Sequence, residues 1–190
     1  MDRRIRKTKT SIKRALVELM RKHTVDTITI KALAYEADID RKTFYNHYAS
    51  IHHAIRSVED DIVNHLFTIT KQYDYKKIRN DPYPLLSQLS SAIENDKLFH
   101  TFLLHPDTTN SLLEKLKQIF RQEFIKSYAN EFLGDPTMFG FAVDFIVSGT
   151  FDVYREWIKD GKPVHLKSLS KTLSGVISRG LGYFNQWEEF

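Results

Sequence analysis

A polar segment near the start of the chain carries side chains suited to nucleic-acid recognition. Residues 41–47 have the sequence RKTFYNH. Basic, hydroxyl and amide groups donate hydrogen bonds to phosphate oxygens and to the edges of bases. Six of these residues are predicted to face outward and to contact double-stranded DNA: Arg41, Lys42, Thr43, Tyr45, Asn46 and His47.

The surrounding residues predict two short helices joined by a tight turn. Thr29 and Asp40 stand at N-cap positions, where a side-chain oxygen accepts a hydrogen bond from a free backbone N–H of the first turn. Apolar residues recur at helical spacing between and after these caps. They are Ile30, Leu33, Ala34, Ala37, Ile39 and Phe44. Two short helices that share a small core in this way have the outline of a helix-turn-helix.

The same residues carry a family resemblance. The run TITIKALAYEADIDRKTFYNHY, residues 27–48, resembles the DNA-binding signature of the tetracycline-repressor-like (TetR) transcriptional regulators. The resemblance extends from about Lys9 to about Ile55. It implies that Thr29 and Lys31, at the start of the supporting helix, contact DNA together with the six residues named above.

Three positions depart from the family pattern. Asp38 occupies the turn position where glycine is usual, and aspartate visits left-handed conformations more readily than most residues. Asp40 replaces a small residue that faces the phosphates, and Ile51 replaces a lysine that is common after the aromatic cluster.

The charge of the chain is divided unevenly. Residues 1–50 contain 12 Lys and Arg against 6 Asp and Glu, whereas residues 51–190 contain 16 against 18. The balance is therefore +6 in the first segment and −2 in the second. A basic segment attracts a polyanion over a long range, so the uneven charge agrees with a DNA-binding part followed by a part with another task.

Helical periodicity accounts for almost the whole chain and predicts an all-α fold. We expect an N-terminal three-helix headpiece that contains the helix-turn-helix, with a first helix from Ser11 to about His23. A long helix capped by Ser50 then leads into a C-terminal helical regulatory body of about five to six helices. The later helices are predicted at residues 85–94, 97–104, 109–132, 137–159 and 166–184. We therefore divide the chain into a DNA-binding domain, residues 1–50, and an effector-binding and dimerisation domain, residues 51–190.

The last two helices have broad apolar faces interrupted by small residues, which allow helices to approach closely. The stretch FIVSGTFDVYREWIKDGKP, residues 145–163, resembles the C-terminal region of a TetR-like subgroup. In that subgroup a helix pair forms a four-helix interface with its symmetry mate, and burial in the chain's own core is the alternative. The predicted interface of a homodimer consists of Ser148, Gly149, Leu173, Val176, Ile177 and Gly180.

Aromatic residues are dense in the middle of the chain and could form the walls of a pocket. The candidates are Phe99, Phe102, Phe120, Phe124 and Tyr128. The alternative is ordinary core packing. TetR-like proteins usually hold a small-molecule effector between such helices, so the resemblance implies an effector there, and within some subgroups it implies a protein coregulator.

Other functional classes lack support in the sequence. His52 and His53 are adjacent and point apart on a helix, and His100 and His105 do not share a helical face, so we predict no metal site and no cofactor. Glycine-rich phosphate loops and common catalytic motifs are missing, so we predict no catalytic residues and no enzyme activity. The chain has no cysteine and no apolar run long enough to span a membrane, and we expect a cytoplasmic protein with no membrane partner.

The sequence therefore predicts a sequence-specific DNA-binding transcriptional regulator. The first hypothesis is a ligand-responsive repressor that binds a palindromic operator as a dimer. The second is a coactivator of the same fold that depends on a protein partner. A third, from a different class, is a helical protein-interaction module that does not bind DNA.

Overall fold

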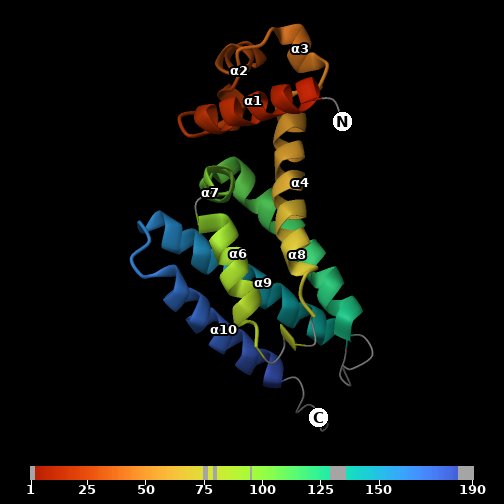
Figure 1. Ribbon diagram of the computed structural model, residues 1–190, viewed down its shortest axis with the longest axis vertical. Coiled ribbons are helices and arrows are strands. Elements are labelled where there is room, and N and C mark those ends of the chain that lie inside the picture. Colours follow the sequence, from red (N-terminus) through yellow and green to blue (C-terminus); the bar gives the residue numbers. More distant parts are fainter. Residues whose placement is uncertain (1–2, 75–76, 79–80, 95, 129–135, 184–190) are drawn as a thin grey trace. The chain divides into compact units, whose positions relative to one another are not determined.

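A computed structural model describes residues 3–74, 77–78, 81–94, 96–128 and 136–183 of the chain (Figure 1). Within these ranges all regular secondary structure is helical, which confirms the predicted all-α fold. The chain divides into two compact units, one formed by residues 1–62 and 97–110 and the other by residues 63–96 and 111–190. The proposed functional boundary at residue 50 stays a prediction.

The first unit contains the predicted three-helix headpiece. Its helices are α1 (Arg3–Met20), α2 (Ile30–Glu36) and α3 (Arg41–Tyr45), with a short 3-10 turn, η1 (Val25–Thr27), between α1 and α2. Each helix contributes a fully buried side chain to the core, namely Leu16, Leu33 and Phe44. Helix α1 begins at Arg3 rather than at Ser11, because the basic residues that precede Ser11 continue the helix instead of forming a tail.

Helix α4 (Ile51–Thr70) begins in the first unit and continues into the second. The hydroxyl of Ser50 accepts a hydrogen bond from the backbone N–H of His53 at 3.1 Å, as expected of an N-cap. Residues at spacings of three and four along α4 are buried, including Val58, Ile62 and Leu66. This pattern is the apolar stripe that the sequence predicted.

Helix α7 (Lys97–Leu104) and the first turn of α8 (Pro106–Tyr128) complete the first unit. The buried His105 side chain lies between these helices, with its Nε2 atom 3.1 Å from the carbonyl oxygen of His23. The carboxylate of Asp107 accepts a hydrogen bond from the backbone N–H of Val25 at 2.8 Å. These two contacts attach the junction of α7 and α8 to the segment that follows α1.

The second unit is built from α6 (Tyr83–Glu94), most of α8, α9 (Pro136–Lys159) and α10 (Leu166–Tyr183), together with the end of α4. Helix α6 packs against α10. Between α9 and α10 the chain turns through Gly161 and Lys162, which have φ angles of 75° and 62°. The indole N–H of Trp157 donates to the carbonyl oxygen of Val164 at 2.9 Å and thereby holds this turn against α9. No described helix has the length and hydropathy needed to cross a membrane.

Candidate nucleic-acid interface and apolar cavity

Two side-chain caps hold the helices of the helix-turn-helix in place. The hydroxyl of Thr29 accepts a hydrogen bond from the backbone N–H of Ala32 at 3.1 Å, at the start of α2. The carboxylate of Asp40 accepts from the backbone N–H of Thr43 at 2.6 Å, at the start of α3. Both caps are as predicted, and they are local interactions that the sequence alone specifies.

The turn between the caps requires a left-handed residue. Asp38 has a φ of 53°, so this aspartate adopts the conformation for which glycine is usual. Backbone hydrogen bonds from Asp38 to Tyr35 and from Ile39 to Ala34 close the end of α2. The turn therefore forms without glycine and places α3 directly after α2.

Asp40 acts on its own helix. Its pKa lies below the ordinary value of 3.8, because the backbone N–H of Thr43 donates to its carboxylate, and the nearby Lys42 also favours the charged form. The carboxylate is therefore ionised at neutral pH and serves as a cap. This role explains how an acid is accommodated at a position where the family pattern has a small residue.

The predicted DNA contacts form an exposed surface around α3. Thr29, Lys31, Arg41, Lys42, Tyr45 and Asn46 are exposed, and Thr43 and His47 are half-buried. Phe44 is 0% exposed, and its ring lies 5.9 Å from the rings of both Tyr45 and Tyr48. One aromatic residue thus anchors α3 in the core, while its neighbours in the sequence remain available at the surface.

Sequence reasoning missed part of this surface. A groove beside the turn is lined by Arg4 and Thr8 of α1, by Tyr35 of α2 and by Asp38 and Thr43, among others. Tyr35 is 87% exposed, the largest value among the exposed large hydrophobic side chains. The signal for α1 was the helical continuity of residues 3–10, which had been interpreted as preceding the first helix.

The six predicted dimer residues do not share one face. Gly149 and Gly180 have no neighbouring atom within 4 Å of where a Cβ would lie, and Val176 is 62% exposed. By contrast, Leu173 and Ile177 are buried within the second unit. The Ser148 side chain is half-buried, and its hydroxyl donates to the carbonyl oxygen of Asp144.

Two exposed aromatic residues extend the outward face of α9. Phe141 is 60% exposed and Phe145 is 77% exposed. They precede Gly149 at intervals of four, so all three lie along one side of the helix. Large exposed aromatic side chains beside open glycines are unusual for a surface that faces only water.

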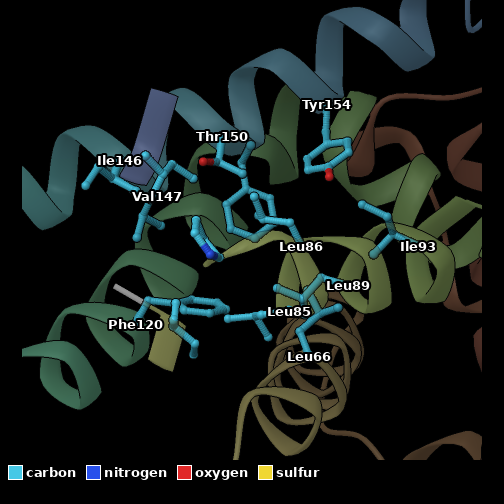
Figure 2. Close-up of a pocket in the computed structure, with 14 residues that line it drawn as sticks. Leu66, Leu85, Leu86, Leu89, Ile93, Phe120, Ile146, Val147, Thr150 and Tyr154 are labelled. Carbon is cyan, nitrogen blue, oxygen red and sulfur yellow. The ribbon is translucent and has the colours of Figure 1, made fainter. Parts of the chain in front are cut away.

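An apolar cavity of about 60 Å³ lies inside the second unit (Figure 2). Fourteen described residues line it, contributed mainly by α4, α6, α8, α9 and α10: Leu66, Ile78, Pro82, Leu85, Leu86, Leu89, Ile93, Phe120, Ile146, Val147, Thr150, Phe151, Tyr154 and Ile177. The rings of Phe120 and Phe151 lie 6.2 Å apart at this wall.

The predicted pocket residues are distributed differently from this lining. Phe120 lines the cavity. Phe99 and Phe102 do not, because α7 belongs to the first unit and buries them there to 1% and 0% exposure. The side chains of Phe124 and Tyr128 lie outside the described residues.

A buried hydroxyl cluster borders the cavity. The hydroxyl groups of Tyr154 and Ser90 are hydrogen-bonded, and Ser90 Oγ lies 3.0 Å from Ser170 Oγ. Ser90 Oγ also donates to the carbonyl oxygen of Leu86 at 2.6 Å. Burial raises the pKa of Tyr154 above 10.0, so its hydroxyl is neutral at physiological pH.

The comparisons with known proteins agree with this architecture. Residues 80–179, more than half of the chain, match the family model TetR_C_8, described as a transcriptional regulator C-terminal region. The chain belongs to the TetR family of transcriptional regulators. Membership makes this TetR-family protein a DNA-binding transcriptional regulator. No curated protein sequence matches it significantly.

Solved structures show the same fold. A TetR transcriptional regulator from Streptococcus agalactiae 2603V is 21% identical with a TM-score of 0.68, and 93% of this chain and 96% of that chain are covered. NalD, the secondary repressor of the MexAB-OprM multidrug efflux pump in Pseudomonas aeruginosa, is 17% identical with a TM-score of 0.68, covering 92% and 96%. The dihydroxyacetone kinase operon activator DhaS is 18% identical with a TM-score of 0.62, covering 93% and 97%.

Proposed function

We propose that this TetR-family protein is a homodimeric, ligand-responsive repressor that binds a palindromic operator. Residues 1–50 would bind DNA, and residues 51–190 would bind the effector and form the dimer. The observation that carries the proposal is the exposed polar surface of α3, which two side-chain caps and the buried Phe44 hold in a fixed orientation.

The DNA-contacting residues are proposed to divide between two tasks. Lys31 and Arg41 supply positive charge for phosphates, and Lys42, Thr43 and Tyr45 are the candidates for base edges. Two copies of α3 would enter successive major grooves, so a dimer requires a fixed half-site spacing of about 34 Å. An effector that changes this spacing by a few ångströms would release the operator.

The first experiment is selection of genomic fragments with the purified protein, followed by affinity measurements on the selected site. Loss of a phosphate contact in Lys31→Ala should make the slope of log affinity against log salt less steep by about 0.9. Lys42→Ala should instead cost about 1–3 kcal/mol and relax the preference for one base pair. Selection of no defined sequence would contradict the proposal and favour the interaction module.

The dimer interface is proposed to lie on the outward faces of α9 and α10. Phe145→Glu and Val176→Glu place a charge on exposed apolar positions there, and both should give monomers in sedimentation that bind the operator poorly. Val164→Glu is the matched control, since Val164 is 51% exposed but lies in the turn between the helices. Dimers in both test variants would place the interface elsewhere.

The second candidate function is a coactivator that depends on a protein partner. Exposed Phe141 and Phe145 favour a protein contact, and they would serve this function if they remain accessible in the dimer. Copurification of a partner that changes operator affinity and is lost in Phe141→Ser, with the dimer intact, would support the coactivator over the repressor.

A further inference from the structure

The cavity of the second unit has a wall with almost no polarity. Twelve of its fourteen lining residues have hydrocarbon side chains, and none of the fourteen is Lys, Arg, His, Asp or Glu. The exceptions are Thr150 and Tyr154, both on α9 (Figure 2). A ligand held here would have no counter-charge in contact with it.

The tyrosine hydroxyl is already engaged within the protein. Tyr154 is 2% exposed, and its hydroxyl bonds to Ser90, which in turn bonds to Leu86 and lies beside Ser170. A ligand that needed several hydrogen bonds would have to break this cluster. An ionised ligand group would lose its hydration without compensation.

Resting on the ligand-responsive function proposed above, we propose that the effector is an uncharged, predominantly hydrocarbon molecule that binds in this cavity. Contact with the aliphatic and aromatic wall would provide the affinity, because transfer of apolar surface from water is the favourable term there. The volume of about 60 Å³ favours a slim molecule such as an aliphatic chain over a rigid polycyclic one.

The test compares three probes that share one hydrocarbon chain: 1-octanol, octanoate and octylammonium. Trp157 is the reporter, because its ring lies 6.5 Å from that of Tyr154, and Trp187→Phe removes the second tryptophan of the sequence. We expect saturable fluorescence change with 1-octanol, and at least tenfold weaker binding of both ions at neutral pH. An ion that binds within threefold of 1-octanol would overturn the proposal.

Two pairs of variants locate the binding site. Thr150→Asp puts a carboxylate into the wall and should raise octylammonium affinity at least tenfold over its affinity for Thr150→Asn, the neutral control of matched size. Ile146→Trp should fill the cavity and abolish 1-octanol binding, whereas Ile158→Trp, a half-buried position on the same helix outside the lining, should retain it. Equal behaviour within both pairs would show that the probes bind elsewhere and would overturn the assignment.

Operator binding separates this inference from the proposed function. Release of the selected operator fragment by 1-octanol, but not by the two ions, supports the ligand class. Release by an ion alone would overturn the ligand class while leaving a ligand-responsive repressor. Binding of 1-octanol without any change in operator affinity would overturn its role as effector, and operator binding by a protein that binds none of the three probes would overturn the cavity as the effector site.

Discussion

The neighbouring residues Phe44 and Tyr45 provide the sharpest test of the headpiece. Phe44 is 0% exposed and Tyr45 is 51% exposed, although both are aromatic and both belong to α3. Replacement of each by alanine removes a similar amount of side chain from opposite sides of the same short helix. The two variants should therefore fail for different reasons.

The magnitude follows from burial. Phe44→Ala removes a ring packed 5.9 Å from the ring of Tyr48 and leaves a cavity in a small core, so we expect a loss of about 3–5 kcal/mol from the free energy of unfolding. A loss of 4 kcal/mol corresponds to roughly a 900-fold change in the folded fraction of the headpiece, since about 1.4 kcal/mol is a factor of ten. Tyr45→Ala should change stability by less than about 0.5 kcal/mol, as for most surface substitutions.

Hydrogen exchange of the α2 and α3 amides and binding to the selected operator are the two assays. In Phe44→Ala, exchange of these amides should accelerate and operator affinity should fall through partial unfolding. In Tyr45→Ala, exchange should match the wild type while operator affinity falls by about 1–3 kcal/mol where a base contact is lost. Wild-type exchange in Phe44→Ala would refute the packing argument, and wild-type affinity in Tyr45→Ala would refute the assignment of the DNA-contacting face.

Three further predictions concern hydrogen bonds. Asp40→Ala should lower the free energy of unfolding by about 1 kcal/mol in urea titrations, whereas Asp40→Asn keeps the cap; because the folded-state pKa of Asp40 lies below 3.8, its stabilisation is complete above that pH and is lost as the pH falls through the folded-state value, and a wild type that follows Asp40→Asn throughout the acid range would contradict this. Asp107→Ala leaves the backbone N–H of Val25 without its acceptor and should cost about 1–3 kcal/mol, with Asp107→Asn as the control that retains an acceptor oxygen, and equal urea midpoints would dismiss the contact. Ser90→Ala leaves the buried hydroxyl of Tyr154 without this partner and should cost more than Tyr154→Phe, which removes that hydroxyl; the reverse order of unfolding free energies would contradict the hydroxyl cluster.

Local features were predictable from the sequence because each depends on residues a few positions apart. The caps of Thr29 and Asp40, the left-handed turn at Asp38 and the cap of Ser50 are all interactions within four residues. The all-α fold followed from periodicity, and the family from the residues around α3. The start of α1 was placed too late, since a run of basic residues was taken for a tail when it forms the first turns of the helix.

Only the tertiary structure decided which neighbour covers each apolar side chain. Along α10 the sequence shows Val176 and Ile177 as equivalent apolar residues, yet one is 62% exposed and the other is buried against the cavity. Likewise, Phe102 and Phe120 are both buried, but they belong to different compact units, and only Phe120 lines the cavity. Helical periodicity shows that a side chain avoids water, whereas the identity of its neighbours depends on contacts between helices that are distant in the sequence.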